Sequence, residues 1–123
     1  MERFSFGPEA AFVPRGGLLD HVSLAPLTPS SGEGALVQAV ILRFEPGGRL
    51  RRHPAGSPQI LAVLEGSGEV SGANCVDEPI RAGEAVFLHE GEDHEMKSEA
   101  GLTALIIEGE YVDRFRGRPK ADP

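Results

Sequence analysis

Side chains that can bind a metal ion or a polar ligand stand at two places in this 123-residue sequence. His53 precedes the cluster "PAGSP", and Gln59 opens the apolar run "QILAVLEG" that follows it. Farther along, His94 lies in the acidic stretch "HEGEDHEM". Imidazole nitrogens are common metal ligands, whereas a glutamine oxygen is a legitimate but neutral one. The three residues therefore raise the question of a metal site at which distant parts of the chain meet.

The alternation of side chains along a strand decides which of these residues can share an interior. If His94 pointed outward, its neighbours Glu95 and Lys97 would be buried, which a protein interior rarely accepts. Two sets of residues are therefore expected to point inward: Gln59, Leu61 and Val63 from one strand, and His94, Met96 and Ser98 from another.

Short strands are the elements expected to position these residues. Sixteen glycines and ten prolines demand many turns and disfavour long helices. Within 35–45, Gln38 shares an apolar-rich face with Leu36, Val40, Leu42 and Phe44, which places its amide inside. The pattern predicts an all-β sandwich or barrel with few or no helices. Strands are predicted at residues 20–27 (an edge strand), 35–45 (ended by "PGG" at 46–48), 59–66 (with 67–72 extending a hairpin-like element), 79–101 (strand, turn and strand) and 102–112.

The length and composition predict a single domain over residues 1–123, with an arm at 1–16, a barrel at 17–112 and a mobile tail at 113–123. A net charge of −7 disfavours nucleic acid as a partner. One cysteine and the lack of a signal-like start or a bilayer-length apolar run favour a cytoplasmic protein without membrane contact. The exposed edge expected at 20–27 predicts a homodimer.

The stretch from Gly47 to Gly66 resembles the first signature of the cupin superfamily. In that signature a glycine, two histidines, a glutamate and a second glycine follow one another at set intervals. His53 takes the place of the first histidine, Ala55 stands where the second belongs, and Gln59 stands where the glutamate belongs. The spacing is kept, while two of the three ligand types differ.

The stretch 83–98 is similar to the second cupin signature, which contains a glycine, a proline, a glycine, a histidine and an asparagine. Gly83, Gly91 and His94 match it, whereas His89 replaces the proline and Ser98 the asparagine. Together the two motifs cover about residues 47–98. The resemblance implies a double-stranded β-helix, or jelly-roll barrel, with a pocket at one mouth.

On this resemblance, one divalent metal ion would be bound by His53, Gln59 and His94. Two imidazoles suit Fe, Ni, Zn, Mn or Cu without distinguishing among them. In the alternative, the pocket is free of metal, His53 bonds within its loop, and Gln59 bonds to His94. His89 is disfavoured as a further ligand by its position in a turn. The residues expected to line the pocket are Gln38, Leu61, Val63, Met96 and Ser98.

Charged residues surround the histidines on both sides. The acidic residues near His94 are interpreted as a solvated turn, and they would raise its pKa if they lay close to the ring. The arginines before His53 are expected to pair with such carboxylates. The two groups are Glu90, Glu92, Asp93 and Glu95, and Arg49, Arg51 and Arg52.

Two classes of function remain open. The favoured one is a small-molecule-binding cupin, with or without a metal, which could act as an effector sensor through a protein partner. The other is a metal-dependent oxygenase, isomerase or lyase that acts on a small polar organic molecule. No residue outside the ligand set stands out as a general base, so catalytic residues stay unassigned. The sequence lacks a phosphate-binding glycine loop, and no nucleotide cofactor is expected.

Overall fold

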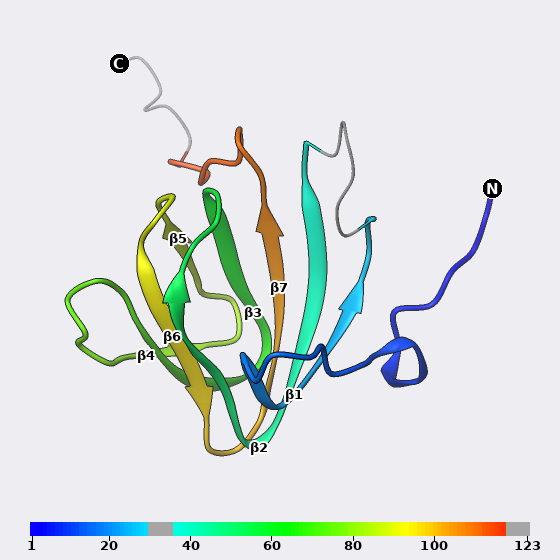
Figure 1. The fold of residues 1–123 in the computed structure, drawn as a ribbon, viewed down its shortest axis with the longest axis horizontal. Helices are drawn as coiled ribbons and strands as arrows, with labels where there is room; N and C mark the ends of the chain where they lie inside the picture. Colours follow the sequence, from blue (N-terminus) through cyan, green and yellow to red (C-terminus); the bar gives the residue numbers. More distant parts are fainter. Residues whose placement is uncertain (30–35, 118–123) are drawn as a thin grey trace, which may run out of the picture.

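The structure is a computed structural model that describes residues 1–29 and 36–117, and these form a barrel of antiparallel strands (Figure 1). Among the described residues, the only helical element is the 3-10 turn η1, Pro8–Ala10. The predicted all-β jelly-roll class is thus confirmed. The strands are β1 (Leu19–Pro26), β2 (Gln38–Pro54), β3 (Gln59–Ser71), β4 (Glu78–Arg81), β5 (Ala85–Leu88), β6 (Asp93–Ser98) and β7 (Leu102–Glu108).

Parts of two predictions fall outside the described residues: residue 35 of the second predicted strand, and residues 118–123 of the predicted tail. In the predicted arm, Phe12 forms a backbone bridge to Leu24 of β1, and no residue of 1–16 is buried. In the described ranges, no helix is long and apolar enough to cross a membrane.

The two longest strands each belong to both walls of the barrel. β2 pairs with β7 as far as Phe44 and then with β6 from Gly48 onward. The predicted strand end at 46–48 is therefore wrong. Gly47, with φ at 83°, lets the chain bend there, and pairing continues with a new partner. β3 changes partner in the same way after Gly66, where φ is 79°.

The stretch 79–101 contains three strands in place of the predicted two. A turn at Ala82 and Gly83 divides its first half into β4 and β5, because Gly83 adopts a positive φ of 92°. β7 also ends earlier than predicted, at Glu108, where the next amide, that of Gly109, donates to the carbonyl of Pro58. The last predicted strand is therefore correct in place but shorter than 102–112.

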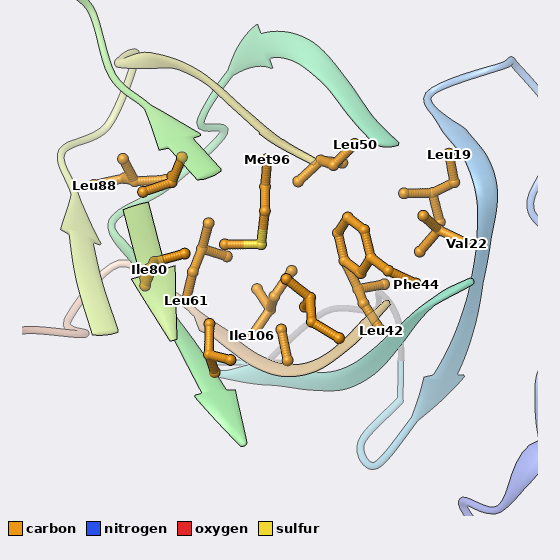
Figure 2. Packing of buried hydrophobic residues seen from close by; sticks show 14 of the residues in the cluster. Leu19, Val22, Leu42, Phe44, Leu50, Leu61, Ile80, Leu88, Met96 and Ile106 are labelled. Carbon is orange, nitrogen blue, oxygen red and sulfur yellow. The ribbon is translucent and has the colours of Figure 1, made fainter. Parts of the chain in front are cut away.

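The inner faces of the strands meet in one hydrophobic core (Figure 2). The alternation predicted for 59–63 and 94–98 is confirmed, since every second residue of both segments is buried. The predicted inner face of 35–45 is correct for Leu42 and Phe44 but wrong for Leu36, which precedes β2 and is exposed. In Figure 2, Leu61 and Met96 approach one another from opposite walls.

Candidate functional site

Several strand ends gather at one end of the barrel, which we call the mouth (Figure 1). β2 begins there at Gln38 and returns there at Pro54. β3 begins at Gln59, β6 begins at Asp93, and β7 ends at Glu108. The three predicted metal ligands therefore lie at or next to strand ends at the mouth.

His53 and His94 face each other across β2 and β6. They are direct partners in the register, and their ring centroids are 4.4 Å apart with planes tilted by 54°. His94 is fully buried, whereas His53 is half-buried. Leu50 also points inward, and His53 lies three positions after it, so strict alternation would place the two side chains on opposite faces. An irregularity in the β2 register between them brings both to the inner face.

Both rings are held by the same kind of backbone hydrogen bond. Nδ1 of His53 donates to the carbonyl of Arg51 at 2.7 Å, and Nδ1 of His94 donates to the carbonyl of Glu92 at 3.0 Å. A carbonyl only accepts, so Nδ1 carries the proton and Nε2 keeps a lone pair. Nε2 of His94 is buried and has no hydrogen-bond partner among the described residues. Histidines that bind metals are commonly oriented by such a second bond.

The environment of His94 keeps its ring neutral. Burial lowers the pKa of His94, the backbone hydrogen bond to Glu92 partly offsets this, and the nearby His53 lowers it further. The net direction is opposite to the rise expected from the acidic stretch, because removal from water outweighs the attraction of the Glu92 carboxylate. A neutral imidazole is the form that binds a metal ion.

Gln59 is buried at the start of β3, as its alternation predicted. The metal-free alternative is correct about His53, which bonds within its own segment. It is wrong about a bond between Gln59 and His94, because Nδ1 of His94 is used by Glu92 and Nε2 has no partner in the described ranges. The site therefore contains a lone pair that none of the described residues uses.

Sequence reasoning missed Glu108, which lies at the mouth on the inner face of β7. It is the register partner of Gln38 in β2 and of Gln59 in β3. The signal was present, because Glu108 continues the alternating set Leu102, Ala104 and Ile106, all of which are buried. The carboxylate stands at the end of an apolar stretch, inside the strand predicted at 102–112, but its inward position was not considered.

The other residues predicted to line a pocket lie deeper in the barrel. Leu61, Val63 and Met96 belong to the hydrophobic core. Ser98 donates to the carbonyl of Ser67 at 2.6 Å and accepts from the amide of Gly101 at 2.8 Å, so it holds the turn between β6 and β7. Ser98 also lines a groove of about 990 Å³ at the end of the barrel opposite the mouth. Contact of these residues with a ligand stays a prediction.

The donor atoms at the mouth form a reduced set for a metal ion. In residues 1–29 and 36–117, no group of three or more His, Cys, Asp or Glu side chains could hold a metal. Ala55, in place of a histidine, is buried in the core. His89 is exposed and packs edge-on against Phe87, so it points away from the pair. Metal binding by His53, Gln59 and His94 therefore stays a prediction, in which the donors would be the two Nε2 atoms and the amide oxygen of Gln59.

The arginines before His53 pair with carboxylates: Arg49 and Arg52 pair with a member of the predicted acidic group, whereas Arg51 pairs with Asp20 instead. Arg49 lies 3.1 Å and Arg52 3.8 Å from the carboxylate of Glu95, and Arg51 lies 3.6 Å from that of Asp20. These ion pairs lie on the outer surface, because Glu95 occupies the opposite face of β6 from His94. Arg52 also donates to the carbonyl of Gly72, and its positive charge contributes to the lowered pKa of His94.

The chain is similar to known proteins in structure, but its sequence matches none in the comparisons made. No protein-family model matches the chain, and no curated protein sequence matches it. The polyketide cyclase RemF from Streptomyces resistomycificus superposes with a TM-score of 0.76 at 19% identity, over 89% of this chain and 80% of that one. An RmlC-like cupin from Shewanella frigidimarina gives 0.69 at 24% identity, over 89% and 91%. A predicted oxalate decarboxylase from Thermotoga maritima gives 0.64 at 25% identity, over 72% and 79%.

Proposed function

The chain has the fold of the cupin superfamily, and on that premise we propose that it binds a small molecule at the mouth of the barrel, beside one divalent metal ion. The buried Nε2 of His94, which has no hydrogen-bond partner among the described residues, carries this proposal. A buried polar atom without a partner costs free energy, and a metal ion would use its lone pair. The ring of His53, whose centroid lies 4.4 Å from that of His94, presents a second Nε2.

The protein's contribution to such a site is orientation. The carbonyls of Arg51 and Glu92 hold the two rings, and Gln59 would add its amide oxygen as a neutral ligand. A metal bound there would supply a Lewis acid for oxygen atoms of the ligand. We favour binding over catalysis, because Ala55 and Gln59 stand where the cupin signature has a histidine and a glutamate. The ligand set therefore lacks one imidazole and one carboxylate.

We also propose a cytoplasmic homodimer. The one cysteine, Cys75, is free and exposed, which suits a reducing compartment. Support for a dimer comes from the open edge of β1. This strand pairs with β2 on one side, and on its other side it forms, among the described residues, a single β-bridge, to Phe12. Light scattering of the purified protein would give twice the mass of the 13.1 kDa chain if this is correct.

Metal content tests the site directly. Protein purified without added metal is incubated separately with Fe²⁺, Ni²⁺, Zn²⁺, Mn²⁺ or Cu²⁺, desalted and analysed by elemental mass spectrometry. We expect about one equivalent of at least one metal, and a loss of affinity of at least about tenfold in His94→Ala. His89→Ala is the matched control, because it removes an exposed imidazole at the same end of the barrel. A wild-type protein that retains no metal, or a His94→Ala variant that binds as tightly, would refute the metal site.

A further inference from the structure

The inner face of the barrel ends at the mouth in a row of three polar side chains. Glu108 of β7 lies between its register partners, Gln38 of β2 and Gln59 of β3. Directly opposed residues of antiparallel strands point to the same face, with Cβ atoms about 5 Å apart. The next row inward consists of residues that belong to the core or pack against it, namely Val40, Ile106 and Leu61. The polar row, which we call the Glu108 row, therefore faces the interior of the mouth.

The polar atoms of the Glu108 row make no side-chain hydrogen bond among the described residues, and only the amide oxygen of Gln59 has another proposed role, as a metal ligand. Gln59 is only 4% exposed, and Gln38 and Glu108 are half-buried. Within the described ranges, side-chain hydrogen bonds at this end of the barrel involve Thr28, His53, Glu92 and His94, and none involves the row. The row is thus a carboxylate between two amides, with acceptors available to a ligand.

The basic side chains of the neighbouring strands do not neutralise this carboxylate. Arg49 and Arg52 are directed to Glu95, and Lys97 to Asp77, on the outer side of the barrel. The whole chain carries a net charge of −7, which also favours the approach of cations over anions. The inner face of the mouth is therefore better suited to a positive group than to a negative one.

We propose that the Glu108 row binds the protonated primary amine of a small ligand. An ammonium group has three N–H donors, and the row offers three acceptors: the Glu108 carboxylate and the amide oxygens of Gln38 and Gln59. The bond to the carboxylate is charge-assisted and is the strongest of the three. The inference rests on the proposed function for the place of the ligand, but it requires no metal ion.

Three probes that differ only in the head group test this inference on chelator-treated protein: butylamine, butan-1-ol and butyrate. Titrations followed by NMR are expected to show the tightest binding for butylamine and the weakest for butyrate. Glu108→Gln keeps the size of the side chain and removes its charge, and it should weaken butylamine binding by about tenfold. Gln38→Leu removes one neutral acceptor and should weaken it less. Glu110→Gln, at an exposed position beyond β7, is the control for charge alone and should leave the affinity unchanged.

Each result decides the matter. The amine site would be overturned by any of three results. These are failure of butylamine to bind, binding of butyrate that is equal to or tighter than that of butylamine, and unchanged butylamine affinity in Glu108→Gln. Equal losses in Glu108→Gln and Glu110→Gln would assign the effect to net charge and also overturn it. Metal content of Glu108→Gln, measured as for His94→Ala, should stay at the wild-type value. A failed metal site with intact amine selectivity would thus be distinguished from a failed amine site.

Discussion

His94 shows how a single residue can differ from what its neighbours in sequence suggest. Acidic residues precede and follow it, yet Glu95 is turned outward to Arg49 and Arg52. The ring itself lies among buried side chains of the core, and the backbone carbonyl of Glu92 holds it in place. Desolvation is therefore the largest influence on the pKa of His94, and it favours the neutral ring.

This burial predicts a stability that depends on pH in the metal-free protein. The pKa of His94 in the folded state lies below its ordinary value of 6.5, so the unfolded chain binds this proton at a higher pH than the folded chain does. The free energy of unfolding should be at its full value above pH 6.5 and should decrease as the pH falls below it. Urea unfolding of chelator-treated protein at several pH values measures this. His94→Gln should lose this part of the pH dependence and His89→Gln should keep it; equal slopes in both variants would contradict the prediction.

At the level of elements, glycines allow β2 and β3 to serve both walls of the barrel. Gly47 and Gly66 adopt positive φ where the strands change partner. Beyond the second bend, β3 passes very close to β6: a Cβ placed on Gly68 would lie 2.3 Å from the carbonyl oxygen of Lys97. The backbone of one strand thus occupies the space that a side chain of its neighbour would need.

Gly68→Ala is therefore expected to destabilise the protein by at least about 2 kcal/mol, because backbone has to move to make room for a methyl group. Gly56→Ala is the matched control: a Cβ there meets nothing within 4 Å, and its φ is not in the left-handed region. That variant should change the free energy of unfolding by less than about 0.5 kcal/mol. Chemical unfolding of both variants gives the comparison, and equal effects would show that the close approach is unimportant.

On the scale of the whole molecule, the two walls are joined by one core in which inner residues of all seven strands β1 to β7 meet (Figure 2). Leu61 has no exposed surface, while Leu64, three residues later on the same strand, is 49% exposed. Core residues such as Leu61 and Met96 fill the barrel below the mouth, which leaves the strand ends to present the polar groups.

Leu61→Ala should therefore lower the free energy of unfolding by about 2–5 kcal/mol, since it removes buried methyl groups and leaves a cavity. Leu64→Ala makes the same chemical change on the outer face and should cost less than about 0.5 kcal/mol. Thermal unfolding of the pair provides the measurement. Similar losses in the two variants would place Leu64 in a buried contact, such as a subunit interface.

The sequence by itself determined what depends on local backbone geometry. Side chains alternate along any strand, so the inward positions of Gln59 and His94 could be predicted, and glycine spacing indicated the class of barrel. Only the tertiary structure decided what depends on strands far apart in the chain. Register set Glu108 between two glutamines, an irregularity in β2 turned His53 inward, and burial reversed the expected pKa direction of His94. Neighbours across a sheet and removal from water are properties of the packed chain, and no local pattern specifies them.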